Sequence, residues 1–179
     1  DNVLIFGLRN IKKCDIEYIK GKLGKTVRYV GTAEKVADKV SAFVEPLIIG
    51  ADSLFSSVKT NNNMISLVGD NVGQLSFFGQ GAGKYPTGTA VAQDVIDIVN
   101  GERSTILPGN KIDADNSVIS KQYYIRTTAA VPADIIESID CVDSVNYIIT
   151  KNVSTSDIHK ISEEILSKDG ESFFAGIER

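Results

Sequence analysis

Three glycines and a lysine stand close together in the segment FGQGAGKYPTGTAVAQDVIDIVNG, residues 78–101. Glycine-rich turns that lead into a helix can hold phosphate groups, because glycine lets the backbone approach a ligand and the helix N-terminus attracts anions. A Walker A loop requires G-x-x-x-x-G-K-[ST]. Here Phe78 occupies the first glycine position and Tyr85 the last position, so this segment is not a Walker A loop.

The dinucleotide fingerprint G-x-G-x-x-G also fails on spacing. Read from Gly79, its last glycine position is Lys84, and read from Gly81 it is Pro86. Two interpretations remain open for residues 81–83. They form a tight turn between a strand and a helix, or their small side chains let the backbone contact a cofactor held mainly by another domain.

The elements around this loop follow from hydrophobic periodicity and turn residues. We expect a hairpin over residues 64–80, and a helix from Thr87, its cap, to Asn100, with Gly101 as its stop. Its apolar face would carry Val91, Val95 and Ile98. Upstream we expect a helix over 13–23, strands over 25–33 and 39–49 joined by a turn at 34–38, a bend or sheet edge at Pro46, and a short helical turn within 51–58.

The C-terminal residues predict a small α+β module. Its expected order is strand, helix, strand, helix, strand, over residues 122–130, 132–139, 144–152, 156–168 and 171–178. The second helix would be capped by Ser156 and would bury Ile158, Ile161 and Ile165. Residues 102–120 contain glycine, proline and aspartate with little periodicity, and are predicted to be a linker.

Composition excludes several classes of function. The net charge of −4 and the absence of a basic stripe argue against nucleic-acid binding, and no apolar run approaches the ~18 residues that would span a membrane. Two distant cysteines and one histidine give no metal site and suit a reducing cytoplasm. The sequence begins at Asp1 with no methionine and no signal peptide, so we expect a fragment of a longer protein.

A longer stretch, NMISLVGDNVGQLSFFGQGAGKYPTGTAVAQDVIDIV, strongly resembles the end of the catalytic domain of homoserine dehydrogenases, and FGLRNIKKCDIEYIKGKLG resembles a segment that precedes it. The resemblance covers residues 1–101. It implies an open sheet that binds substrate and dimerises, and NAD(P)-dependent interconversion of L-aspartate 4-semialdehyde and L-homoserine on the route to threonine and methionine. It also implies a homodimer.

The same resemblance places the last glycine of the loop, Gly83, beside the nicotinamide cofactor, with Gly81 and Ala82 as its neighbours. The nucleotide fingerprint and the catalytic residues of the family precede the region covered here. We therefore expect no catalytic residue in this chain, no cofactor bound to it alone, and no activity without the missing domain. Lys84 is interpreted as a solvent-exposed cation.

Residues 121–179 resemble a shortened ACT regulatory domain, a ferredoxin-like α+β fold. The usual glycine after the turn proline is here Ala133, following Pro132, and one strand between residues 139 and 150 is expected to be missing. The predicted fold is therefore α+β: an open, mostly antiparallel sheet covered by helices over 1–101, then the linker, then an ACT-like regulatory or dimerisation module. A different class of protein, a non-enzymatic amino-acid-binding or dimerisation protein built from similar parts, stays open.

Overall fold

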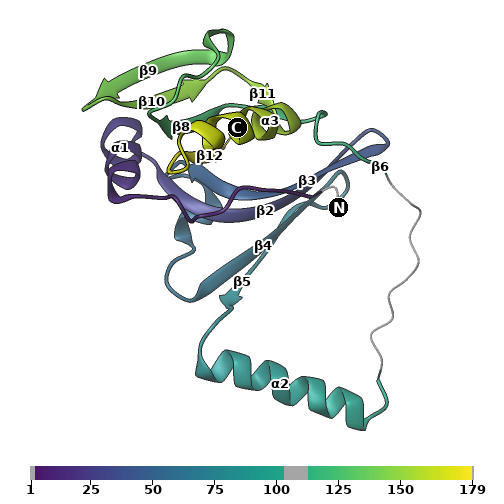
Figure 1. Ribbon diagram of the computed structural model, residues 1–179. Coiled ribbons are helices and arrows are strands. Elements are labelled where there is room, and N and C mark those ends of the chain that lie inside the picture. The colour runs from purple at the N-terminus through teal and green to yellow at the C-terminus, as the bar shows by residue number, and fades with distance from the viewer. Residues whose placement is uncertain (1–2, 103–112, 179) are drawn as a thin grey trace. The chain divides into compact units, whose positions relative to one another are not determined.

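The computed structural model describes residues 3–102 and 113–178 (Figure 1). Within these residues the α-helices are α1 (Lys13–Leu23), α2 (Lys84–Val99) and α3 (Thr155–Lys168), and the short 3-10 helices are η1 (Leu54–Ser57) and η2 (Ala133–Ile135). The strands are β1 (Leu4–Ile5), β2 (Thr26–Val36), β3 (Lys39–Ile49), β4 (Asn62–Gly69), β5 (Gly73–Gln80), β6 (Asp113–Ala114), β7 (Ser120–Lys121), β8 (Tyr123–Thr127), β9 (Ile136–Val142), β10 (Val145–Thr150), β11 (Val153–Ser154) and β12 (Phe173–Ile177).

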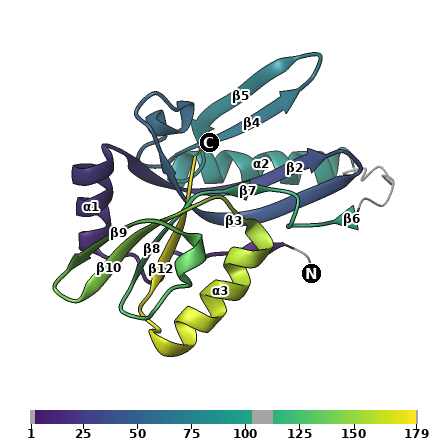
Figure 2. The same cartoon turned by 90° about the horizontal axis from the view of Figure 1, so that it is seen from above.

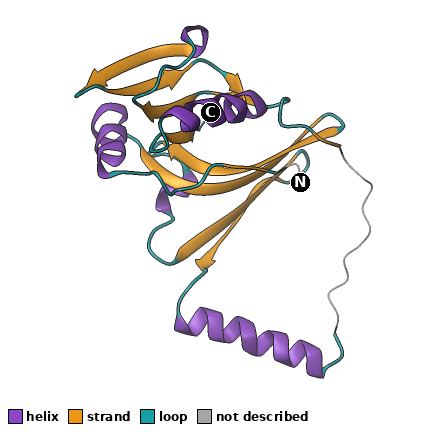
Figure 3. Cartoon of the chain, in the orientation of Figure 1, coloured by secondary structure: helices purple, strands orange, loops and turns teal. Residues whose placement is uncertain are grey.

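Most strand pairs are antiparallel and helices are few, which confirms the predicted fold class (Figure 3). The predicted helix 13–23, the two strands after it, and the hairpin over 64–80 are confirmed as α1, β2, β3 and β4–β5. The short helical turn is present as η1.

The chain divides into two compact units, which we describe separately. Unit 1 comprises residues 1–52 and 111–179, and unit 2 comprises residues 53–110. In unit 1 the strands β3 and β12, from opposite ends of the chain, belong to one sheet. The predicted linker lies partly outside the described residues, and its described part contains β6 and the first residue of β7.

Strand β3 lies inside the sheet of unit 1 and is not an edge strand, so of the two alternatives predicted at Pro46, a bend or a sheet edge, the edge is wrong. One side of β3 pairs with β2 along its whole length. The other side pairs in parallel with β6, then β1 and then β12. The carbonyls of Val44 and Ile48 accept hydrogen bonds from that second side. Backbone groups of alternate strand residues point to the same side, so those of Pro46 also face this second side. Position 46 lies there between Val44, the last residue paired with β1, and Leu47, the first residue paired with β12. The N–H group that Pro46 lacks therefore removes no hydrogen bond from either strand pair.

Two apolar clusters lie on opposite faces of this sheet, because successive strand residues point to opposite sides. Tyr123 and Ile125 of β8 pack in the cluster that contains residues of α3, whereas Tyr124 packs in the cluster that contains Ile19 of α1. Figure 2 shows β8 and β12 between the two helices. Each helix thus covers one face of the unit 1 sheet.

Helix α3 matches its prediction except at its start. Ile158 and Ile165 are buried and Ile161 packs against the same cluster, as the periodicity indicated. The N-cap is Ser154, not Ser156: the Ser154 hydroxyl accepts a hydrogen bond from the Asp157 N–H at 3.1 Å. The helix therefore begins at Thr155, one residue before the predicted cap.

The helix predicted over 132–139 was wrong, and so was the missing strand. Residues 133–135 form only the 3-10 turn η2, and residues 136–142 form β9, which pairs with β10. Asp143 and Ser144, both with positive φ, join the two strands in a two-residue turn. Such a turn matches the twist of a hairpin, so the pairing with β10 overrides the local helix signal of Pro132 and Ala133. From Tyr123 onwards the order is therefore β8, β9, β10, the two-residue β11, α3 and β12, with η2 before β9.

His159 on α3 predicts how the stability of this chain depends on pH. Its ring stacks on Phe6 with centroids 3.9 Å apart, and within the described residues its buried Nε2 has no hydrogen-bond partner. Burial lowers the pKa of His159 from 6.5 to about 4. Between these values the unfolded chain binds more protons than the folded chain, so the free energy of unfolding is expected to decrease as the pH falls through this window.

The variant His159→Phe is expected to retain the stacking and to lose this component of the pH dependence. Urea denaturation of both proteins at pH 7 and pH 5 measures it. Because His159 is the only histidine in the chain, no other imidazole obscures the comparison. An equal decrease in both proteins would contradict the assignment.

Candidate functional site

The glycine-rich loop joins β5 to α2 within unit 2. Helix α2 begins at Lys84 with Gly83 as its N-cap, so the predicted cap at Thr87 was wrong. The Thr87 N–H donates to the Gly83 carbonyl at 3.1 Å and already belongs to the helix. Pro86 fits in the first turn because N–H groups there have no intrahelical partner. At the other end, the Gly101 N–H donates to the Ile98 carbonyl, as expected for the predicted stop.

Asn61, just before β4, fixes the loop through its backbone and its side chain. Its carbonyl accepts from the Gly81 N–H at 2.9 Å, and its Nδ2 donates to the Ala82 carbonyl at 2.8 Å. The hairpin places Asn62 opposite Gln80, which brings these segments together. The sequence analysis did not select Asn61, and the register of the β4–β5 hairpin is the signal that would have found this contact.

Gly81 and Gly83 each meet a local requirement of the loop. A Cβ at Gly81 would overlap the Asn63 side-chain amide and lie 2.6 Å from its Cγ. Gly83 has φ +118°, a conformation that L side chains rarely adopt, although a Cβ there would have room, with its nearest neighbour at 3.6 Å. The predicted residues 81–83 thus lie directly before α2, next to the side chains of Asn61 and Asn63.

The lysine beside the loop, Lys84, shows no arrangement for catalysis. It is exposed, and its Nζ lies 5.7 Å from the centroid of the Tyr85 ring. This agrees with the interpretation of an exposed cation. The positive end of the α2 dipole is at the same place and favours polar or anionic groups.

Unit 2 has no buried residue among its described residues, 53–102. The register places four large apolar side chains on one face of the β4–β5 hairpin, with exposed fractions from 46% to 62%: Ile65, Leu67, Leu75 and Phe77. The predicted apolar face of α2, formed by Val91, Val95 and Ile98, is also exposed. Apolar surface of this extent is typical of interfaces.

Unit 1 buries two ion pairs that were not predicted from the sequence. Asp15 pairs with Arg126, and Glu45 pairs with Lys121. Burial raises the pKa of Glu45, and no hydrogen-bond partner of its Oε2 is present in the described part of the chain. Glu45 lies in the apolar run FVEPLII, where an isolated acid is a signal of a buried charge. We assign neither pair a catalytic role.

Residues 3–102 and 113–178 contain neither a cluster of metal-binding side chains nor a membrane-spanning helix. No group of three or more His, Cys, Asp or Glu side chains that could hold a metal ion is present there. No helix in that range is long and apolar enough to cross a membrane. Cys14 and Cys141 are free thiols. The cytoplasmic location stays a prediction.

Comparison with known proteins agrees with this fold. A solved homoserine dehydrogenase of Thiobacillus denitrificans superimposes with a TM-score of 0.69 over 99% of this chain and 48% of that chain, at 19% identity. A Staphylococcus aureus homoserine dehydrogenase, at pH 7.5, gives a TM-score of 0.60 over 99% of this chain and 47% of that chain, at 22% identity. The fold is therefore similar to that of about half of each of these solved chains.

Sequence comparison identifies the family. A sequence model described as homoserine dehydrogenase matches residues 1–96. The homoserine dehydrogenase of Helicobacter pylori is 30% identical over 93% of this chain and 40% of its own length, and that of Bacillus subtilis is 28% identical over 75% and 29%. The chain belongs to the homoserine dehydrogenase family. It spans less than half the length of these relatives.

Proposed function

We propose that this chain is the C-terminal part of a homoserine dehydrogenase. The complete protein would interconvert L-aspartate 4-semialdehyde and L-homoserine with NAD(P), on the route to threonine and methionine. The observation that carries the proposal is the family match over residues 1–96, which includes the whole glycine-rich loop and most of α2.

We propose that Gly83, with Gly81 and Ala82, contacts the nicotinamide cofactor. The loop fits such a group, because its residues are small and it stands at the N-terminus of α2. The cofactor would supply the hydride chemistry. The residues of this chain would shape one wall of its site, with Asn61 holding the loop in place through the Ala82 carbonyl.

The exposed apolar surfaces of unit 2 support the proposal that the chain works with further protein. We propose that they are covered by the remainder of the same protein and by a second copy in a homodimer. Among its described residues, 53–102, unit 2 buries none by itself, so its apolar side chains are removed from water only by contact with further protein. We propose the C-terminal residues 121–179 as an ACT-like regulatory or dimerisation module.

A spectrophotometric assay tests this function. The complete protein is expected to oxidise NADH or NADPH when L-aspartate 4-semialdehyde is added, and the chain of residues 1–179 alone is expected to show no turnover, since the proposed catalytic residues are outside it. A complete, folded protein that leaves both cofactors unoxidised would contradict the proposal and favour a non-enzymatic amino-acid-binding or dimerisation protein. Turnover by residues 1–179 alone would contradict the missing-domain account.

A further inference from the structure

Three consecutive asparagines, Asn61, Asn62 and Asn63, lie at the start of β4. Asn61 and Asn63 both contact the glycine-rich loop. Successive strand residues point to opposite faces, so Asn62 points away from the face that carries Asn63. The side chains of the two asparagines at the loop differ in one respect, which is whether their amide groups already have partners within the protein.

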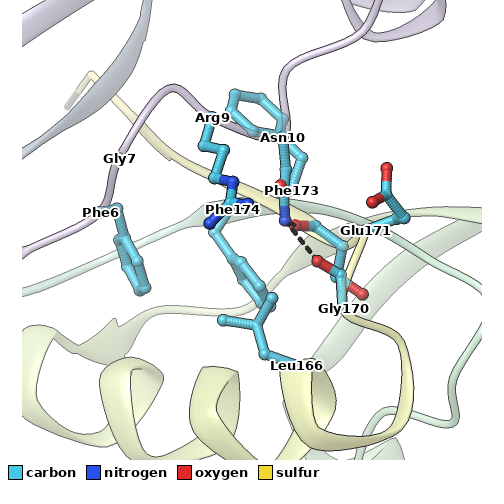
Figure 4. Close-up of a pocket in the computed structure, with 10 residues that line it drawn as sticks. Phe6, Gly7, Arg9, Asn10, Leu166, Gly170, Glu171, Phe173 and Phe174 are labelled. Atoms are coloured by element: carbon cyan, nitrogen blue, oxygen red, sulfur yellow. Dashed lines mark hydrogen bonds between the residues drawn. The ribbon is translucent and has the colours of Figure 1, made fainter.

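The side chain of Asn61 is occupied at both ends. Its Nδ2 donates to the Ala82 carbonyl at 2.8 Å, and its Oδ1 accepts a hydrogen bond from the Thr60 hydroxyl at 3.3 Å. The side chain of Asn10 in unit 1 is engaged in a similar way, because its Nδ2 donates to two backbone carbonyls at 2.8 Å and 2.9 Å (Figure 4). Both amides therefore serve to hold backbone segments of the protein together.

The amide of Asn63 has no such role. Its side chain is exposed, and within residues 3–102 and 113–178 no hydrogen bond engages it. It lies against Gly81, where a Cβ would be 2.6 Å from Asn63 Cγ. Directly opposite Asn63 in the hairpin is Gly79, and a Cβ there would meet no atom within 4 Å. The amide of Asn63 is thus available to a ligand that lies over this backbone.

The chemistry of this amide indicates what it would bind. A carboxamide has two N–H donors and a carbonyl acceptor, so it can pair with another primary carboxamide through two hydrogen bonds. The nicotinamide ring of NAD(P) carries such a group. Carboxylate and ammonium groups form their strong hydrogen bonds with charged side chains, and Asn63 has no charge. Asn63 therefore matches the carboxamide of the cofactor better than the charged groups of an amino-acid substrate.

The spacing along the strand fits the same ligand. Asn61 lies next to Gly83, because its Nδ2 would be 3.6 Å from a Cβ at that glycine, whereas Asn63 lies next to Gly81. Residues two positions apart on a strand are separated by about 7 Å, a distance that a nicotinamide ring with its carboxamide can span. A ring in contact with Gly83 can thus place its carboxamide at Asn63.

We propose that Asn63 recognises the nicotinamide ring, by accepting a hydrogen bond from the carboxamide N–H of the cofactor and donating one to the carboxamide carbonyl. This inference rests on the proposed dehydrogenase function and on the contact of Gly83 with the cofactor. It adds the side chain that orients the ring over the loop, and so makes Asn63 a specificity-determining residue.

Isothermal titration calorimetry of the complete protein tests this role. The ligands are NAD⁺ or NADP⁺, whichever the protein uses, and the analogue of the same nucleotide with an acetyl group in place of the carboxamide. The acetyl group keeps the carbonyl and lacks the N–H donors. Asn63→Ala is expected to weaken the natural cofactor by about 10-fold, because two hydrogen bonds are lost, and the analogue by only about 3-fold, because one is lost.

The matched control is Asn62→Ala, the same change at the neighbouring position on the other face of β4. It is expected to leave both affinities unchanged. The preference for the natural cofactor over its analogue is measured on one preparation of each variant. A fraction of unfolded protein therefore changes the apparent stoichiometry and leaves this preference unaltered.

The outcomes separate this role from the proposed function. If the parent protein binds the cofactor and Asn63→Ala keeps the parental preference for it over the analogue, the role of Asn63 is overturned and the proposed function is not. A parent protein that binds neither NAD⁺ nor NADP⁺ would overturn the cofactor site together with this inference. A preference that falls by about 3-fold in Asn63→Ala, and stays parental in Asn62→Ala, is the result expected from the structure.

Discussion

Replacing Arg126 with methionine is expected to lower the free energy of unfolding by about 3–5 kcal/mol, because it leaves a buried carboxylate without its counter-charge. Arg126 Nε lies 2.8 Å from Asp15 Oδ1, and Asp15 is fully buried. The Tyr124 hydroxyl and the Lys12 N–H also donate to Asp15. These bonds join the start of α1 to β8 across 111 residues of sequence. Chemical denaturation followed by circular dichroism measures the change.

Two further variants show whether charge burial is the cause. Lys13→Met removes an exposed i,i+4 ion pair with Glu17 and is expected to change stability by less than about 0.5 kcal/mol. The double variant Asp15→Leu/Arg126→Met removes both buried charges and is expected to be more stable than Arg126→Met alone. A single variant Arg126→Met within about 1 kcal/mol of the parent protein would contradict this account of the pair.

In the complete protein, Gly83→Val is expected to lower kcat/KM by about 100-fold, through a higher KM for the cofactor, a lower kcat, or both. Gly83 has φ +118°, which a β-branched residue resists, so the loop and the first turn of α2 must move. In the proposed site the new side chain would also block the close approach of the nicotinamide. Steady-state kinetics with varied NADPH measures the loss.

The matched control for this variant is Gly21→Val. Gly21 lies on the surface of α1, with no atom within 4 Å of its Cβ position and no positive φ. It is expected to retain parental kinetics. Parental kinetics in Gly83→Val itself, with the folded state confirmed by circular dichroism, would remove Gly83 from the cofactor site.

Local signals predicted much of the fold. Helices α1 and α3 and the hairpin β4–β5 are formed by residues close in sequence, so periodicity and turn residues were sufficient. The helix predicted over 132–139 failed because β10 offered this segment a strand partner, and propensity does not report on pairing. The edge position predicted for Pro46 failed because β1 and β12 come from distant parts of the chain.

The candidate site likewise contains residues that could be found from the sequence and residues that only the folded structure brings together. The loop residues 81–83 could be selected from the sequence through the family resemblance, whereas glycine spacing alone left a tight turn equally open. Asn61 could not, since its contact with Ala82 depends on hairpin register. The pairs Asp15–Arg126 and Glu45–Lys121 join residues that lie 111 and 76 positions apart, and no periodic pattern links such charges.

The central claim is that the Gly81–Gly83 loop forms one wall of a nicotinamide cofactor site. A crystal structure of the complete protein with bound NADP⁺ tests it most directly. The account predicts backbone atoms of Gly83 in van der Waals contact with the nicotinamide end of the cofactor, at about 4 Å. A cofactor whose nicotinamide ring is bound away from this loop, with other residues or solvent between them, would contradict it.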